Sequence, residues 1–360
     1  MKKIILGTIV FFTTILSFSQ NSAESNTGKY EIKRNVNFSE STSSYYKIFR
    51  EENFSSEGEV IQFSISDKKI NSPESQSNYF NISKTQSISN KNQKSTAIIE
   101  SLPVSEFTNK NTYALIIGNE DYKSHQPSLN YEQNVEFAIN DAKLFRELCN
   151  KTLGVPNENI IYVENATYAK TKQSIEQIEL ICKHTTTKPT ILFYYSGHGL
   201  PEESTRIPHI IPVDVSGSNL NFGISLPELY KSLTKYPVEK AIVVLDACFT
   251  GDARNSGLVS SRAVRLRPKA NELNSRIVVF SSSSSDQPSK SYKEKEYGLF
   301  TYYLSQKIIE SKGNVTLGEL DEYLVENVPV RSVLINKTEQ VPQTNVSNEI
   351  VNEWKNWTLK

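Results

Sequence analysis

From Thr112 onward, runs of apolar residues alternate with segments in which apolar residues recur every three or four positions. The runs are short and continuously apolar, as in strands that are buried on both faces. They span residues 113–118, 160–163, 190–196, 240–246 and 276–282. Strands and helices that alternate in this way predict an α/β domain with a mainly parallel central sheet and helices on both faces.

The segments between these runs carry helical signals. Two stripes of apolar residues at helical spacing predict the first two helices. The first stripe consists of Val135, Ala138, Ala142, Phe145 and Cys149, and the second consists of Ile175, Ile178 and Cys182. Capping boxes predict helix starts at Ser225–Glu228 and Thr316–Glu319. The run 299–309 predicts a further helix, whereas residues 197–223 are expected to form a long irregular loop.

The N-terminus has the features of an export signal. Lys2 and Lys3 precede the apolar run 4–18, and small residues follow at Ser17 and Ser19. This order predicts a secretory signal peptide over 1–19, cleaved after Ser19, and an exported protein that is periplasmic or secreted. The alternative is an uncleaved anchor, but the run is shorter than the ~20 residues of a membrane span. We therefore expect no stable membrane span.

Composition divides the rest of the chain. Residues 20–105 are rich in Ser, Asn, Lys and Gln, and they predict a pro-segment or linker without a core of its own. A single α/β domain is expected over 106–345, followed by a C-terminal tail over 346–360. The hydrophobic content of 37% for the whole chain agrees with a partly unpacked N-terminal region.

The charge balance argues against one class of partner. Lys plus Arg and Asp plus Glu both total 40, and removal of Lys2 and Lys3 with the signal peptide gives 38 − 40 = −2. A chain without a basic field is not expected to bind nucleic acid. We expect a monomer.

The candidate chemistry lies at the ends of two predicted strands. His198 follows the run 190–196 and Cys248 follows the run 240–246. Sites in α/β sheets form outside the C-terminal ends of the strands. An imidazole at that edge can deprotonate a thiol, which then becomes a strong nucleophile. Gly197 and Gly199 would leave room for a substrate carbonyl. The alternative is a buried structural thiol beside a turn histidine.

Two further cysteines are assigned no chemistry. Cys149 and Cys182 lie on the first and second predicted helices. If the chain adds one strand beside the first and then crosses to its other side, right-handed crossovers place these helices on opposite faces of the sheet. The two sulfurs would then be too far apart for a disulfide, although an exported protein meets oxidising conditions.

The two motifs "YYSGHG" (194–199) and "DACFTG" (246–251), together with "YALIIGN", "AINDAKLF" and "GLFTYYL", resemble the caspase-like cysteine peptidases, specifically the metacaspase branch. The resemblance covers about residues 112–345. It implies the caspase fold and a thiol endopeptidase in which His198 is the base and Cys248 the nucleophile. Backbone N–H groups of Gly199 and Cys248 would form the oxyanion hole.

The resemblance also implies a substrate preference. The metacaspase specificity pocket maps onto Asp141, Ser196 and Asp246, whereas animal caspases carry Gln at the position of Asp246. Two carboxylates around one slot favour Arg or Lys before the scissile bond. The expected partners are therefore protein or peptide substrates with basic residues. The alternatives are a surface or capping carboxylate for Asp141 and a hydrogen-bonding strand end for Asp246.

No metal or other cofactor is expected. Many metacaspases bind calcium through clustered aspartates, but the corresponding loops of this chain contain only Glu202, Glu203, Asp214 and Asp252. Calcium prefers six to eight oxygen ligands, so this set does not predict a tight site. A zinc site is not expected either, because no Cys-x-x-Cys motif or suitably spaced His pair is present.

The loop after Cys248 predicts self-processing. Residues 252–275 are polar and without periodicity, and they contain Arg262 and Arg265, which a basic-specific site would cleave. The alternative is a solvated basic loop that is not cleaved. For the protein as a whole, the alternatives are a non-catalytic or regulatory caspase-like interaction module and a thiol-transfer protein.

Overall fold

The computed structural model describes residues 30–35, 45–50, 98–129, 133–249, 273–284 and 287–360. The chain divides into two compact units, residues 1–89 and 90–360. In the first unit, β1 (Tyr30–Asn35) pairs antiparallel with β2 (Tyr45–Arg50). The predicted signal peptide and most of the predicted pro-segment lie outside the described residues.

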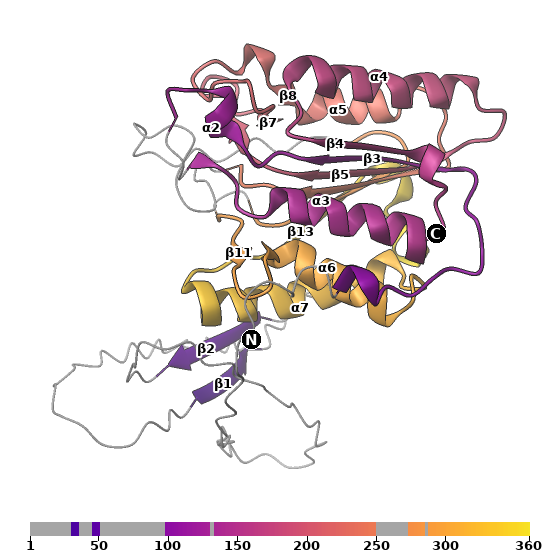
Figure 1. Ribbon diagram of the computed structural model, residues 1–360. Coiled ribbons are helices and arrows are strands. Elements are labelled where there is room, and N and C mark those ends of the chain that lie inside the picture. The colour runs from indigo at the N-terminus through magenta and orange to yellow at the C-terminus, as the bar shows by residue number, and fades with distance from the viewer. Residues whose placement is uncertain (1–29, 36–44, 51–97, 130–132, 250–272, 285–286) are drawn as a thin grey trace, which may run out of the picture. The chain divides into compact units, whose positions relative to one another are not determined.

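A six-stranded sheet forms the centre of the second unit (Figure 1). Its spatial order is β13-β10-β9-β5-β3-β4, and all neighbours are parallel except β10 and β13. The strands are β3 (Thr112–Gly118), β4 (Ile160–Glu164), β5 (Thr190–Ser196), β9 (Lys240–Asp246), β10 (Ile277–Ser281) and β13 (Gln343–Val346). The predicted α/β class and its five parallel strands are confirmed.

Helices cover both faces of this sheet (Figure 1). One face carries α3 (Ala138–Glu147), α6 (Leu299–Glu310) and α7 (Leu317–Asn336), and the other carries α4 (Tyr168–His184) and α5 (Leu226–Leu233). Successive residues of a strand point to opposite faces, so β3 places Ile116 in the first core and Ile117 in the second.

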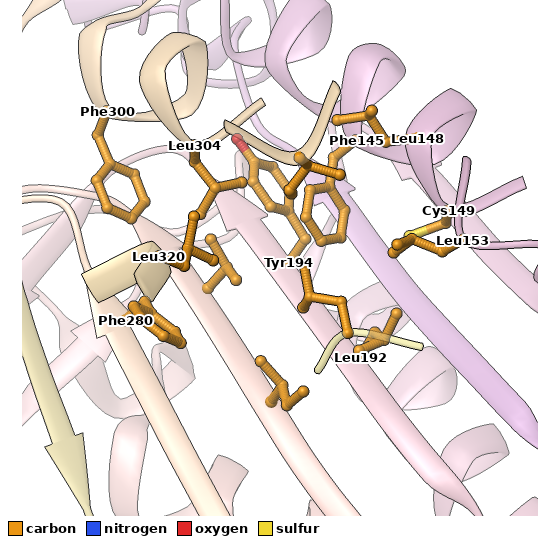
Figure 2. Packing of buried hydrophobic residues seen from close by; sticks show 14 of the residues in the cluster. Phe145, Leu148, Cys149, Leu153, Leu192, Tyr194, Phe280, Phe300, Leu304 and Leu320 are labelled. Atoms are coloured by element: carbon orange, nitrogen blue, oxygen red, sulfur yellow. The ribbon is translucent and has the colours of Figure 1, made fainter. Parts of the chain in front are cut away.

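The core on the α3 and α6 side is built from large side chains (Figure 2). The rings of Phe145 and Tyr194 are stacked with centroids 4.5 Å apart, and Leu304 and Leu320 join α6 and α7 to the same core. Cys149 belongs to this core, whereas Cys182 lies in the core of the opposite face. The expected placement of the two cysteines is confirmed, and both thiols are free.

The helix starts agree with the sequence in part. Thr316 and Glu319 form both hydrogen bonds of a capping box. Ser225 caps α5 by accepting the N–H of Glu228, but the Glu228 carboxylate forms an ion pair with Lys172 of α4 at 2.6 Å. The second half of that predicted box is therefore replaced by a contact between helices.

The first predicted helix starts later than expected. α3 begins at Ala138, and its N-cap residue Phe137 has a φ of 69°. Val135 precedes the helix and packs in a separate small cluster with Tyr122, so its assignment to the helical stripe was wrong. The segment Leu148–Thr152 continues the helix as a π-helical turn that keeps Cys149 buried.

Small elements of three kinds lie in segments that had no regular pattern. The expected irregular loop contains β6 (Gly199–Pro201) and β7 (Pro208–Ile210), which form a three-stranded sheet with β8 (Ile224–Ser225) directly after the loop. A hairpin of β11 (Ser291–Tyr292) and β12 (Tyr297–Gly298) precedes α6. Short helical turns comprise α2 (Tyr122–His125), Asn157–Asn159, Leu220–Phe222, Asn348–Ile350 and Trp354–Asn356.

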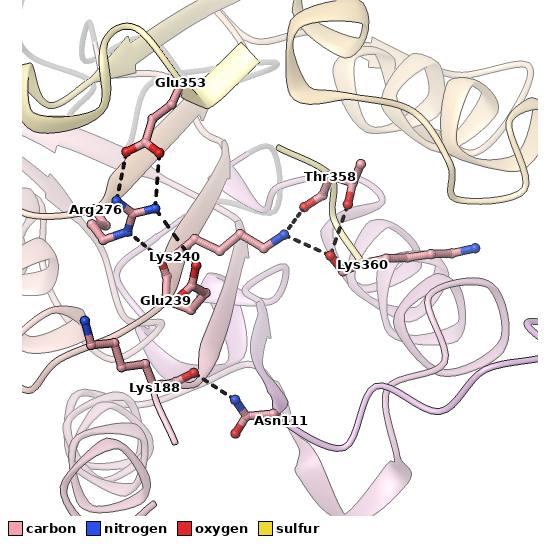
Figure 3. Close-up of polar contacts among 8 residues, drawn as sticks. All are labelled: Asn111, Lys188, Glu239, Lys240, Arg276, Glu353, Thr358 and Lys360. Atoms are coloured by element: carbon pink, nitrogen blue, oxygen red, sulfur yellow. Dashed lines mark hydrogen bonds and ion pairs between the residues drawn. The ribbon is translucent and has the colours of Figure 1, made fainter. Parts of the chain in front are cut away.

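Residues 346–360 pack on the domain at the N-terminal edge of the sheet. Ile350, Trp354 and Leu359 belong to the core. The Lys240 ammonium donates to the carbonyl oxygens of Thr358 and Lys360 (Figure 3). Near these contacts, Arg276 binds Glu353 at 2.8 Å (Figure 3). These contacts leave the opposite, C-terminal edge of the sheet for the candidate site. Among the described helices, none is long and apolar enough to cross a membrane.

Candidate active site

The ends of β5 and β9 bring the two candidate catalytic residues to one place. Ser196 and Asp246 are register partners in these neighbouring parallel strands. His198 and Cys248 each lie two residues further along the chain, so they emerge at the same edge of the sheet. The two turns are in contact, because a Cβ built on Gly199 would lie 3.0 Å from the Cys248 carbonyl oxygen.

The imidazole of His198 is buried, with 4% of the residue exposed. Its Nε2 lies 2.6 Å from the backbone carbonyl oxygen of Gln133. A carbonyl can only accept, so Nε2 carries the proton in the neutral ring and Nδ1 is the basic nitrogen. Gln133 therefore fixes the tautomer that a general base requires. This contact cannot be predicted from the sequence, because every residue type carries the same backbone carbonyl.

The thiol of Cys248 is also buried, with 5% of the residue exposed, and it donates to the Gln287 carbonyl oxygen at 3.7 Å. The other two cysteines are chemically different. Burial raises the pKa of Cys182 to about 11 and raises that of Cys149 further. Both are therefore protonated thiols at neutral pH, far from the edge of the sheet where His198 lies.

The two glycines of the histidine turn have structural roles. A Cβ at Gly197 would lie 2.5 Å from the hydroxyl oxygen of Tyr195, and one at Gly199 would lie 2.6 Å from the ring of Phe249. Real Cβ atoms do not approach other atoms so closely. Aromatic side chains of the protein therefore lie where a Cβ would stand at either position, so packing alone requires glycine here. Room for a substrate carbonyl beside these glycines stays a prediction.

The Gly199 N–H points away from the small sheet. The N–H of Ile211 donates to the His198 carbonyl, and the register of β6 and β7 places these two residues opposite each other, one position beyond the strands. Hydrogen-bonded and non-hydrogen-bonded pairs alternate along antiparallel strands. Gly199, opposite Ile210, is consequently a non-hydrogen-bonded residue whose N–H is directed away from β7. That direction suits a donor to a substrate oxygen.

Asp141 and Ser196, which the resemblance assigns to one pocket, are in contact in the structure. Ser196 Oγ donates to Asp141 Oδ2 at 3.0 Å, and the N–H of Gly298 donates to Oδ1 at 2.7 Å. Gly298 is the N-cap of α6. Asp141 is fully buried, so it is not a surface carboxylate. The negative charge of Asp141, after burial, raises the pKa of Tyr297 in the adjacent hairpin.

Asp246 is held by the same helix. Its Oδ2 accepts the hydroxyl of Thr301 at 2.7 Å and the Thr301 N–H at 3.3 Å, and its Oδ1 accepts the Ser289 hydroxyl at 2.6 Å. The N-terminus of a helix stabilises negative charge. Both carboxylates therefore lie at the positive end of α6 and accept hydrogen bonds from neutral donors.

Three pocket residues were not predicted, namely Ser289, Gly298 and Thr301. Gly298 and Thr301 lie in the motif "GLFTYYL", but nothing local in that motif shows that its backbone faces two distant carboxylates. Among the described residues, no group of three or more His, Cys, Asp or Glu side chains could hold a metal ion. Asp252, Arg262 and Arg265 lie outside the described residues.

A thiol and an imidazole at adjacent strand ends of an α/β domain are the groups that a cysteine peptidase needs. A family model described as Caspase domain (Peptidase_C14) matches residues 111–349. The protein therefore belongs to the caspase-domain peptidase family. None of the curated proteins matches the chain significantly.

Two solved structures resemble the second unit. Protein GSU0716 from Geobacter sulfurreducens is 17% identical, covers 66% of this chain and 93% of its own, and gives a TM-score of 0.49. Caspase-1 from Spodoptera frugiperda is 14% identical, covers 68% of this chain and 89% of its own, and gives a TM-score of 0.44. Identities this low carry no information about substrate.

Proposed function

We propose that the protein is a cysteine endopeptidase with a His198–Cys248 dyad. Nδ1 of His198 takes the proton of the Cys248 thiol, and the thiolate attacks the carbonyl carbon of the scissile bond. The N–H groups of Gly199 and Cys248 stabilise the oxyanion. His198 then protonates the leaving amine, and water hydrolyses the thioester to regenerate the thiol.

The observation that carries this proposal is the paired placement of the two residues. Ser196 opposite Asp246 fixes the relative position of the two turns, and the Gln133 carbonyl fixes the proton of the imidazole on Nε2. A histidine with a purely structural role would not require an Nδ1 that can accept a proton next to the turn that carries Cys248. The same arrangement argues against the regulatory module and the thiol-transfer alternative.

The proposed specificity for Arg or Lys rests on Asp141 and Asp246. Their burial strengthens the attraction to a cation, because a low dielectric weakens Coulomb interactions less than water does. Arginine can bind both carboxylates through its several N–H groups, whereas lysine offers one charged nitrogen. Since both side chains are fully buried, a substrate side chain reaches them only when a neighbouring segment moves.

Two further parts of the proposal rest on sequence alone. The N-terminal segment 1–19 would export the protein to the periplasm or the medium. The mature enzyme would process itself after Arg262 or Arg265, because both residues match the proposed specificity and lie in the loop that follows the nucleophile.

Hydrolysis of fluorogenic peptides ending in Arg, Lys or Asp tests the proposed function. We expect cleavage after Arg and Lys, no activity for Cys248→Ala, and at most a trace for His198→Ala. Cys182→Ala is the matched control, since it also removes one buried thiol, and it should keep full activity. Unchanged activity in Cys248→Ala or His198→Ala would refute the dyad, and a preference for Asp would refute the pocket assignment.

A further inference from the structure

The main chain of His198 is held by two tyrosine hydroxyls. The His198 N–H donates to the hydroxyl of Tyr122 at 2.9 Å, and the hydroxyl of Tyr195 donates to the His198 carbonyl at 2.7 Å. Tyr122 comes from α2, just after β3, and Tyr195 is the penultimate residue of β5. Two residues from different elements therefore bind both polar backbone groups of the candidate base, and the His198 carbonyl also accepts the N–H of Ile211.

The two hydroxyls belong to one buried network. They lie 3.3 Å apart, and the hydroxyl of Tyr122 donates to the Ile211 carbonyl at 2.9 Å. The Asn119 side chain donates to the same carbonyl and accepts the N–H of Ala166. Both tyrosines are almost completely buried, and burial raises the pKa of each phenol. The hydroxyls are therefore neutral and remain hydrogen-bond donors at every physiological pH.

Tyr122 also contacts the imidazole itself. The ring centroids of Tyr122 and His198 are 4.5 Å apart, with an angle of 59° between the ring planes. On the other side, Nε2 is held by the Gln133 carbonyl. An aromatic ring stabilises a cation that approaches it, so this contact favours the imidazolium that forms when His198 accepts the thiol proton.

We propose that Tyr122 and Tyr195 are positioning residues for the His198–Cys248 dyad, an inference that rests on the proposed function. Neither hydroxyl contacts the reacting atoms. They act through the backbone of His198, and they keep Nδ1 at the place from which it can reach the Cys248 thiol. Displacement of a catalytic group by about 1 Å is enough to lower a rate strongly.

The test compares Tyr122→Phe and Tyr195→Phe with Tyr230→Phe. Tyr230 is a buried tyrosine on α5, so its variant controls for the loss of a buried hydroxyl. We expect the first two variants to lose about tenfold in kcat per titrated active site, with KM within about twofold of the wild-type value. Because both hydroxyls hold the same residue, the double variant should lose less than the product of the single losses.

A second measurement needs no peptide substrate. The rate of alkylation of Cys248 by iodoacetamide, followed against pH, reports how well a nearby imidazolium stabilises the thiolate. In Tyr122→Phe and Tyr195→Phe, the midpoint should move upward toward that of a free thiol, and it should not move in Tyr230→Phe. A shifted midpoint in a protein that cleaves no peptide would support the positioning role and refute the proposed function.

Two results would overturn the inference. One is an unchanged alkylation midpoint together with an unchanged kcat in both Tyr122→Phe and Tyr195→Phe. The other is a loss confined to KM, which would place the two tyrosines in substrate binding. Normalising kcat to titrated sites removes the contribution of unfolded protein, so a purely structural effect on folding yield would leave both readouts unchanged.

Discussion

Asp246 shows how one side chain can serve the fold and the site at once. The alternative for this residue was a hydrogen-bonding strand end, and its contacts with Ser289 and Thr301 fit that description. The same contacts hold a buried carboxylate directly before the Ala247–Cys248 turn. The sequence could predict the carboxylate from its motif. It could not predict Ser289, which lies 43 residues away in the chain.

Replacing Asp246 by Asn keeps the shape and removes the charge. We expect kcat/KM for Arg-ended peptides to fall by about a hundredfold, since two charge-assisted hydrogen bonds to the substrate are weakened. The thermal midpoint should change little by comparison. Asp214→Asn, at an exposed carboxylate, is the control. Equal losses in the two variants would remove Asp246 from the substrate site.

At the scale of elements, a strand could be predicted from the sequence where its residues form an uninterrupted apolar run. The five parallel strands are continuously apolar, and each was located within about a residue of its observed bounds. β13 was missed because its four residues, "QTNV", are mostly polar and lie at an edge of the sheet. β6 to β8 were missed because strands of two or three residues are too short to show alternation.

The N-terminus of α6 should link the stability of the fold to the cleavage of Arg-ended peptides, because Thr301 contacts both the core and the proposed pocket. Because the Thr301 hydroxyl donates to Asp246, it accepts from Tyr194 at 2.6 Å. Thr301→Val removes both hydrogen bonds, and we expect a loss of about 1–3 kcal/mol in the free energy of unfolding together with weaker cleavage after Arg. Thr316→Ala removes the cap of α7 at a cost of about 1 kcal/mol and should leave cleavage unchanged. Full activity in folded Thr301→Val would argue against a link between α6 and the pocket.

The small sheet that begins at Gly199 should weaken in acid. His209 of β7 is buried, which lowers its pKa in the folded protein, although its Nδ1–H donates to the Ile207 carbonyl. The unfolded chain then binds the proton more readily, so stability is lost as the pH falls below the ordinary histidine pKa. His209→Asn keeps a donor without a titrating group, and its thermal midpoint should fall less between pH 7 and pH 5. An equal fall in both proteins would contradict this.

For the whole molecule, the sequence predicted one α/β domain after a long N-terminal region. The structure separates units at residue 89 and packs residues 346–360 against the core through Trp354 and Leu359. The sequence predicts a tail for that segment, because its few apolar residues are scattered and show neither strand nor helix periodicity. Their role follows from long-range packing beside the N-terminal edge of the sheet, which a local pattern cannot show.

Self-processing concerns the whole molecule, because a cut after Arg262 or Arg265 would divide the chain in the loop that follows Cys248. Incubated wild-type protein should give new N-termini at Ala263 or Leu266, whereas Cys248→Ala should remain intact. N-terminal sequencing of the products decides this. If Cys248→Ala yields the same fragments, another protease produced them. If wild-type protein that cleaves peptides remains uncut after incubation, the loop is not a substrate.

Covalent labelling tests the central claim most directly. A peptidyl-arginine chloromethyl ketone loses chloride when a thiolate attacks its methylene carbon, so the adduct marks the reactive thiol and reports the specificity together. We predict one adduct per chain, located at Cys248 by mass spectrometry, absent in His198→Ala and strongly reduced with the Asp analogue. Labelling at Cys149 or Cys182, or equal labelling by the Asp analogue, would contradict a basic-specific His198–Cys248 peptidase.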